Sequence, residues 1–259
     1  MNKTIDLIAD TGLAEKTRKS RLPARLDFLQ SATGLFLALF MWAHMLFVSS
    51  ILLGKDAMYA VTKFFEGQYI LGRSYPGIVS VVVAFVFLIF IAHAGLAMRK
   101  FPSNYQQYNT FRGHMDMLRH GDTSLWFVQV YTGFAMFFLG SVHLYIMLTH
   151  PDKIGPYGSA DRVVTEWMWP LYILLLLAVE LHGGIGLYRL AVKWGWLEGR
   201  NPKESRAKLK RAKWYLTAFF LTLGLLTLAA YIKIGIEHRD RAGEPYVPAS
   251  LQQPVDAKG

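Results

Sequence analysis

The chain has 259 residues, of which 53% are hydrophobic and 14% aromatic, and its formal net charge at pH 7 is +10. This length suits one large domain or two small ones, and the absence of cysteine excludes disulfides and Cys-ligated iron–sulfur clusters. The basic residues sit in short segments between apolar runs, which is typical of membrane proteins. We therefore expect contact with a lipid bilayer and none with nucleic acid.

Five apolar runs organise the chain. Each has at least the ~20 residues that an α-helix needs to cross a bilayer, and five in series are not typical of a soluble helical core. They cover residues 26–53, 77–98, 125–148, 167–192 and 214–236. We predict an all-α membrane protein with five transmembrane helices, of which the first four form an up-down-up-down bundle.

The polar segments complete the predicted organisation. Residues 1–25 form an N-terminal arm, residues 26–236 the membrane domain, and residues 237–259 a polar tail that we expect to be extended. One side of the predicted membrane carries 19 Lys and Arg residues and the other carries 9. The positive-inside rule then places the arm in the cytoplasm and the tail outside. We find no convincing internal repeat.

Four histidines fall inside predicted spans, one in each of the first four. A lone intramembrane histidine is usually just hydrogen-bonded to a neighbouring helix, but one per helix indicates a shared role. His44 and His143 lie in the outer half of the membrane, and His93 and His182 lie in the inner half. In an up-down-up-down bundle each pair spans a diagonal, where two imidazoles can hold a flat ring from both sides. We predict two hemes b; two histidines alone would leave a zinc site incomplete.

Two carboxylates are candidates for proton chemistry. Glu180 lies inside the fourth span, two residues before His182, so the two side chains point about 200° apart around the helix. A carboxyl group at this depth can hold and release a proton; the alternative is a neutral structural carboxyl with a hydrogen-bond partner. Glu66, in the outer loop after the first span, can accept a proton from a quinol, although a solvated loop glutamate is the simpler interpretation.

Polar side chains near the span ends are candidates for binding heme propionates. Gln30, Ser31, Trp126 and Lys193 lie at the depth of the inner heme, and Arg162 lies at the depth of the outer one. The alternative for Lys193 and Arg162 is that they only set topology and extend their charges to the membrane surface.

Several segments together resemble one family, the diheme cytochrome b subunit of bacterial menaquinol:fumarate reductases, over residues 18–236. The resemblance is carried by residues 31–36, 90–94, 98–102, 119–122, 133–145, 166–170, 179–183 and 186–195, which read SATGLF, FIAHA, MRKFP, RHGD, GFAMFFLGSVHLY, EWMWP, VELHG and GLYRLAVKWG.

The resemblance implies a subunit that anchors an FAD flavoprotein and an iron–sulfur protein at the cytoplasmic face of a bacterial inner membrane, with its C-terminus in the periplasm. It implies that menaquinol is oxidised near the outer heme and that electrons pass to fumarate, which is reduced in a partner subunit. It also implies the two histidine pairs as heme ligands, Glu66 in quinol oxidation, Glu180 in proton movement, and a dimer of heterotrimers.

Three alternatives remain from the sequence. The same subunit can serve a succinate dehydrogenase that reduces menaquinone, because sequence does not set the direction of the reaction. The buried His and Glu residues also suit a proton-coupled transporter, and the helices suit a structural anchor without heme. Heme content distinguishes the last two from the first.

Overall fold

The computed structural model describes residues 20–101, 104–118 and 121–251, and these ranges are helical and contain no strand. Parts of the predicted arm and tail (residues 1–19 and 252–259) and Arg119 and His120 of the family motif lie outside the described residues. Five helices are long and apolar enough to cross a membrane, which confirms the all-α membrane class. They are α2 (Leu22–Val48, continued by the 3₁₀ turn η1, Ser49–Leu53), α5 (Gly77–Met98), α7 (Gly121–Thr149), α9 (Trp169–Trp194) and α10 (Pro202–Glu237).

Four shorter helices and one further 3₁₀ turn connect the long ones within the described part of the chain, and two more 3₁₀ turns follow α10. They are α3 (Lys55–Phe65), α4 (Gln68–Leu71), α6 (Tyr105–Leu118), α8 (Pro156–Val164), η2 (Pro151–Lys153), η3 (Arg239–Arg241) and η4 (Ala249–Leu251). The sequence was expected to form loops in most of these places.

The fifth long helix begins earlier than predicted, at Pro202 rather than at Trp214. The side chain of Asn201 caps it by accepting hydrogen bonds from the backbone N–H groups of Lys203 (3.2 Å) and Glu204 (3.4 Å). Proline at the first helical position adds to this start signal. The start of α10 is therefore set by its cap in a polar segment, and apolarity alone could only place the membrane-crossing part.

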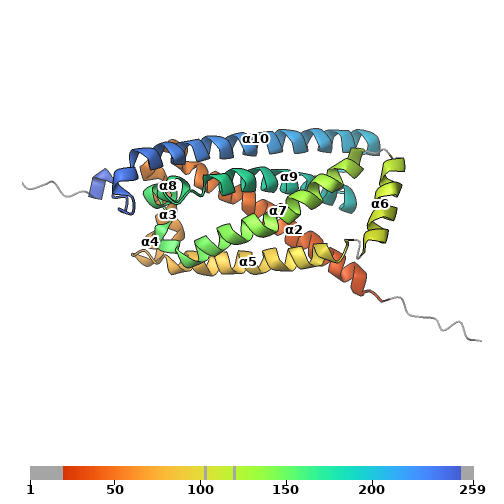
Figure 1. The fold of residues 1–259 in the computed structure, drawn as a ribbon, viewed down its shortest axis with the longest axis horizontal. Helices are drawn as coiled ribbons and strands as arrows, with labels where there is room; N and C mark the ends of the chain where they lie inside the picture. The colour runs from red at the N-terminus through yellow and green to blue at the C-terminus, as the bar shows by residue number, and fades with distance from the viewer. Residues whose placement is uncertain (1–19, 102–103, 119–120, 252–259) are drawn as a thin grey trace, which may run out of the picture.

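The first four long helices contact one another in a closed ring. The contacts run from α2 to α5, α5 to α7, α7 to α9 and α9 back to α2, so α2 lies opposite α7 and α5 opposite α9 (Figure 1). Helix α10 lies outside this ring and packs on α9, α8 and α2. Helix α6 lies at one end of the ring, which we call the α6 end; α3, α4 and α8 lie at the other, which we call the α8 end (Figure 1).

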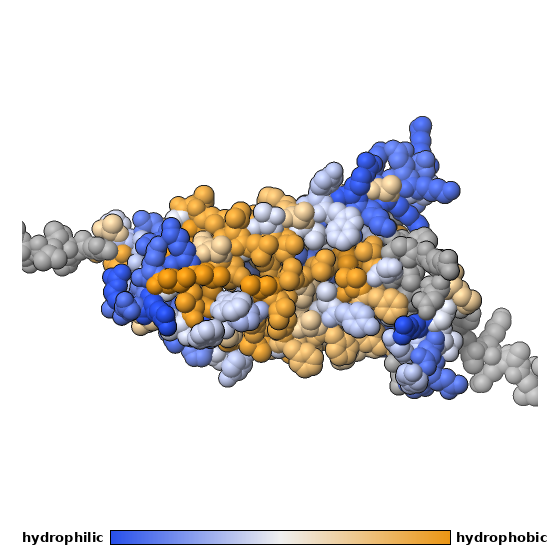
Figure 2. Space-filling view, turned by 45° about the horizontal axis from the view of Figure 1, so that its top comes forward, coloured by the Kyte–Doolittle hydropathy of each residue, from blue (hydrophilic) through white to orange (hydrophobic). Residues whose placement is uncertain are grey.

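The surface of the molecule has an apolar band between two polar ends (Figure 2). Large hydrophobic side chains such as Val81, Leu88 and Phe138 are exposed along the long helices. An apolar band of this kind is stable when lipid tails cover it, and the polar ends suit the aqueous faces of a bilayer. The long helices thus run across the membrane, from one polar end to the other.

The described part of the tail packs against the α8 end, so the expectation of an extended tail is wrong for it. The buried carboxylate of Asp161 accepts hydrogen bonds from His238 Nδ1 and from the backbone N–H of Gly243, both at 2.9 Å. The hydroxyl of Tyr246 donates to Asp56 at 2.6 Å. These contacts, which we call the tail clasp, connect the tail to α8 and to α3.

Candidate functional site

The four predicted histidines come together in two pairs. The rings of His44 in α2 and His143 in α7 have their centres 6.2 Å apart with planes at 57°. The rings of His93 in α5 and His182 in α9 have their centres 6.5 Å apart with planes at 87°. Each pair connects two helices that lie opposite each other in the four-helix arrangement. We call the first the α8-end pair and the second the α6-end pair.

The spacing within each pair suits two imidazoles on opposite sides of one metal ion. Metal–imidazole bonds of about 2.0–2.1 Å put the centres of two such rings about 6 Å apart. Among the described residues, no group of three or more His, Cys, Asp or Glu side chains is placed to hold a metal ion. A metal at either pair would therefore need further ligands from outside the protein, as a porphyrin ring supplies.

The surroundings of the two pairs differ. At the α8-end pair, the ring of Phe40 stacks on His44 (6.0 Å, 9°) and the ring of Tyr172 meets His143 edge-on (5.7 Å, 82°). Nδ1 of His143 is buried and has no hydrogen-bond partner in the described part of the chain. At the α6-end pair, by contrast, both Nδ1 atoms lie near oxygen acceptors of neighbouring helices.

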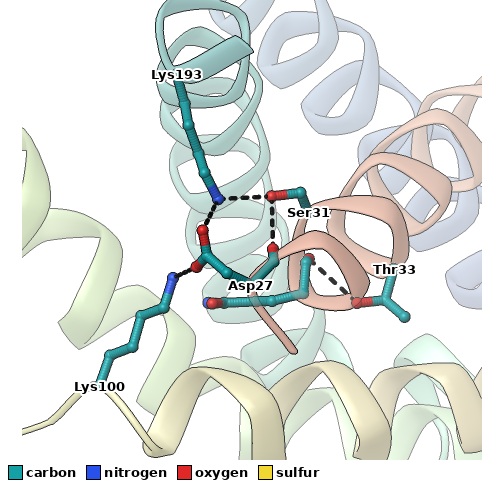
Figure 3. Close-up of polar contacts among 6 residues, drawn as sticks. Asp27, Ser31, Thr33, Lys100 and Lys193 are labelled. Carbon is teal, nitrogen blue, oxygen red and sulfur yellow. Dashed lines mark hydrogen bonds and ion pairs between the residues drawn. The ribbon is translucent and has the colours of Figure 1, made fainter. Parts of the chain in front are cut away.

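Three of the predicted propionate-binding residues, Gln30, Ser31 and Lys193, lie near the start of α2 and the end of α9; Figure 3 shows the contact between Ser31 and Lys193. The Nζ atom of Lys193 lies 3.0 Å from Ser31 Oγ, and this hydroxyl donates to the carbonyl of Asp27 at 2.9 Å. Gln30, next to Ser31, has a buried side-chain oxygen without a partner among the described residues. Of these three side chains, the ammonium group of Lys193 is the donor that can bind a carboxylate.

Two residues of this cluster, Asp27 and Lys100, were not predicted. Lys100 and Lys193 both form ion pairs with the carboxylate of Asp27 (Figure 3). Lys100 comes from the end of α5 and Lys193 from the end of α9, so only the tertiary arrangement brings them together. Two ammonium groups around one carboxylate show that this place accommodates negative charge.

The remaining propionate candidates lie elsewhere. Trp126 is half-buried near the start of α7, where its ring meets that of Phe127 at 5.2 Å. Arg162 is buried in α8 and donates to the carbonyl of Lys153 at 3.0 Å. Its guanidinium is thus at the α8 end, on the same side of the molecule as the His44–His143 pair.

Glu66 is buried, so the alternative of a solvated loop glutamate is wrong. It follows α3 directly, and its side chain is among the least exposed in the molecule. The carboxylate binds Lys63 in an ion pair and accepts a hydrogen bond from Ser74. Lys63 also donates to Ser74 Oγ at 3.1 Å, so the three side chains form one polar cluster at the α8 end.

Glu180 and His182 face different helices, as their spacing predicts. A Cβ placed on Gly183 would contact Met41 of α2, and one on Gly184 would contact Thr217 of α10. Glu180 is three to four residues before these glycines and therefore shares their face, between α2 and α10. His182 lies on the side of α9 that faces α7, where its Nδ1 is 2.8 Å from the carbonyl of Gln129.

The side chain of Glu180 is almost completely buried. Neither carboxyl oxygen makes a hydrogen bond of good geometry among the described residues, and the buried indole nitrogen of Trp42 in α2 is a donor that interacts with this carboxyl group. The predicted alternative of a structural carboxyl therefore has one candidate partner in this geometry, the indole N–H of Trp42.

Known proteins resemble this chain over most of its length. The family of succinate dehydrogenase/fumarate reductase transmembrane subunits matches residues 105–225. A fumarate reductase cytochrome b subunit of Wolinella succinogenes is 61% identical over 230 residues, which cover 89% of this chain and 90% of that protein. A fumarate reductase cytochrome b subunit of Helicobacter pylori strain J99 is 55% identical over 248 residues, covering 96% and 94%. The chain therefore belongs to the fumarate reductase cytochrome b subunits, the membrane-spanning subunits of the succinate dehydrogenase/fumarate reductase family.

Proposed function

We propose that this chain is the menaquinol-oxidising membrane anchor of a fumarate reductase and that it binds two hemes b. The observation that carries the proposal is the pair of bis-histidine sites, one toward each end of the helix ring, with ring centres 6.2 and 6.5 Å apart. Membership of a cytochrome b family supports heme b as the cofactor. Two sites along the bundle axis suit electron transfer across the membrane.

The residues of the chain fit these cofactors. His44 and His143 would ligate one iron, and His93 and His182 the other. At the α6 end Lys193, Ser31, Gln30 and Trp126 would bind propionates, and at the α8 end Arg162 would do so. When bound, each heme b would supply a one-electron carrier. The apolar side chains of the four helices would exclude water from the hemes. The closed arrangement of these helices holds the two histidines of each pair at a fixed distance.

Glu66 is our candidate for the proton acceptor in quinol oxidation. Oxidation of a quinol releases protons as well as electrons, so the site needs a base near the outer heme. Lys63 and Ser74 hold the carboxylate of Glu66 in place through an ion pair and a hydrogen bond, and a fixed carboxylate can act as a general base. The cluster lies at the α8 end, with the His44–His143 pair.

Glu180 is our candidate for proton transfer through the membrane. Its carboxyl group is buried between α2 and α10, away from the histidine beside it in the sequence. An ionisable carboxyl group this far inside a membrane-spanning helix, beside the indole of Trp42, is a candidate for holding and releasing a proton. The arrangement separates the proton-carrying group from the α6-end pair on the same helix.

The distribution of charge supports an orientation. The α6 end carries the Lys- and Arg-rich segments, including the first turns of α10, so we place it in the cytoplasm. The iron–sulfur subunit and the FAD flavoprotein would then dock at the α6 end, and the tail clasp would lie in the periplasm of a bacterial inner membrane. The resemblance further implies a dimer of these heterotrimers.

A heme assay of the purified protein tests the central claim. Pyridine hemochrome analysis should give two hemes b per chain. No heme would overturn the proposal in favour of a transporter or a structural anchor, and one heme would break the assignment of two pairs.

The purified complex tests the reaction. Glu66→Gln should abolish menaquinol-driven fumarate reduction, yet leave fumarate reduction by an artificial donor to the soluble subunits intact. Glu166→Gln, a change of an exposed carboxylate at the same end, is the matched control. Rates of fumarate reduction and succinate oxidation in liposomes, with and without a membrane potential, will show the preferred direction. Faster succinate oxidation would favour the succinate dehydrogenase alternative.

A further inference from the structure

Helices α2 and α7 contain the same pattern, although no internal repeat was expected. Gln-x-x-Thr-Gly is followed, ten residues after the glycine, by histidine. The pattern reads Gln30, Thr33, Gly34 and His44 in α2, and Gln129, Thr132, Gly133 and His143 in α7. At 100° per residue these four positions fall within about 100° of arc, so each set lies on one face of its helix.

Each Gln-x-x-Thr-Gly motif contacts the imidazole of a histidine from the next long helix, α5 for the motif in α2 and α9 for the motif in α7. A Cβ on Gly34 would lie 2.8 Å from Cε1 of His93, and a Cβ on Gly133 would lie 2.9 Å from Cε1 of His182. These distances are too short for any side chain. Glycine therefore lets each imidazole lie directly against the backbone of the neighbouring helix, with the same ring atom at the contact in both cases.

The threonine of each motif lies beside Nδ1 of the same imidazole. Thr33 Oγ1 is 3.1 Å from Nδ1 of His93, and Thr132 Oγ1 is 3.5 Å from Nδ1 of His182. Both hydroxyls donate their hydrogen to a carbonyl of the preceding helical turn, at 2.8 Å for Thr33 and 2.6 Å for Thr132. Each threonine oxygen is thus left as an acceptor toward the imidazole.

These contacts fix the tautomer of both rings. The carbonyl of Gln129 lies 2.8 Å from Nδ1 of His182 and can only accept a hydrogen bond. With acceptors beside both Nδ1 atoms, the hydrogen of each neutral imidazole lies on Nδ1 and the lone pair on Nε2. The α6-end pair is therefore prepared for metal binding through Nε2, whereas the α8-end pair has ring contacts at His44 and an unpartnered Nδ1 at His143 within the described residues.

We infer that the two Gln-x-x-Thr-Gly motifs are a duplicated positioning device that orients His93 and His182 as axial ligands of the inner heme. The inference rests on the proposed heme binding. A hydrogen bond to Nδ1–H makes a ligating imidazole more basic. A more basic ligand favours ferric iron, so the motifs lower the midpoint potential of the inner heme and leave the outer heme unaffected.

The hydroxyls are tested in the intact, heme-loaded complex. Thr33→Val and Thr132→Val, singly and together, should retain two hemes per chain and raise the midpoint potential of one heme only, as measured by spectroscopic redox titration. Each single change should have a partial effect, because His182 keeps its bond to the Gln129 carbonyl and His93 keeps its bond to the Gln30 carbonyl. Thr33→Ser keeps the hydroxyl group and should therefore leave the midpoint potential at its wild-type value. The control is Ser141→Ala, which removes a hydroxyl of α7 that donates to the Phe137 carbonyl of the same helix.

The glycines are tested by retention of heme. Gly34→Ala or Gly133→Ala should displace one imidazole and speed transfer of one heme to apomyoglobin by about 10- to 100-fold, the usual effect of disturbing the support of a metal ligand. Gly95→Ala, at a transmembrane position with open space around a Cβ, is the matched control. Both hemes shifting equally, or no change in either potential or transfer rate, would overturn the inference. A wild-type protein without heme would instead overturn the proposed function.

Discussion

The tail clasp gives a prediction whose size can be worked out from the structure. Asp161 is buried and accepts two hydrogen bonds at 2.9 Å, from His238 and from the backbone of Gly243. Asp161→Asn keeps the shape of the side chain but replaces one acceptor oxygen with an NH₂ donor. One bond is lost, and a buried donor is left facing another donor.

Hydrogen bonds to charged groups contribute about 1.5–3 kcal/mol, and an unsatisfied buried donor costs about 1–3 kcal/mol. Some of this loss is relieved when the tail shifts and admits water, so we expect the clasp to weaken by about 2–3 kcal/mol. Since 1.36 kcal/mol corresponds to a factor of ten, opening of the tail should become about 30- to 150-fold more frequent.

Hydrogen–deuterium exchange of the peptide that contains residues 238–247 measures this opening. Asp161→Asn should speed exchange there and leave exchange in α7 and α9 unchanged. Asp152→Asn, a change of an exposed aspartate at the same end, should have no effect. If exchange in the tail changed by less than threefold, the two bonds would not be what holds the tail, and the reasoning would be refuted.

Four further changes test other contacts. Lys63→Gln removes the ion-pair partner that positions the carboxylate of Glu66, so menaquinol oxidation should fall at least about tenfold while dye-driven fumarate reduction persists. Unchanged quinol oxidation would contradict the role of the pair. Thr227→Val removes a buried 2.8 Å hydrogen bond to a serine of η1 and should destabilise the protein by about 1 kcal/mol, which a double-mutant cycle with Ser49→Ala will check. Gly235→Ala would place a Cβ 2.6 Å from a backbone oxygen of α8, so thermal unfolding should show a loss of about 1–3 kcal/mol, and an unchanged melting temperature would disprove this contact. Burial, helped by a neighbouring carboxylate, raises the pKa of Tyr246 from 10.0 to about 12. The folded protein therefore holds the hydroxyl proton to higher pH than the unfolded chain, and the contribution of Tyr246 to stability is complete below about pH 10 and lost toward pH 12. Alkaline unfolding of the wild type and of Tyr246→Phe will measure this contribution.

Glu180 and His182 are close in the sequence but face different helices. His182 faces α7 and the α6-end pair, and Glu180 faces α2 and α10. Side chains two positions apart on an α-helix point about 200° apart in any fold. That Glu180 and His182 face different neighbours could therefore be predicted from their spacing alone. Which neighbours each side chain meets could not, because that depends on the rotation of α9 within the bundle.

The class of the protein and the candidates for its site could be read from the amino-acid sequence. Long apolar runs are local signals of membrane-crossing helices, since each must satisfy its own backbone groups in lipid. The depth of each histidine follows from its distance along a helix of known direction, so helix direction and residue spacing were enough to predict the two pairs. The sequence also contained the Gln-x-x-Thr-Gly repeat, but without a partner for each motif its meaning was not apparent.

The surroundings of those candidates depend on the tertiary structure. Lys100 and Lys193 meet at Asp27 from the ends of different helices, and Glu66 is buried with Lys63 and Ser74 rather than solvated. Likewise, the tail folds back on α8 through Asp161. These contacts join segments far apart in the chain, and they depend on how the helices pack and rotate against one another. Local apolarity and spacing carry no information on that packing, which is why the environment of the site had to come from the fold.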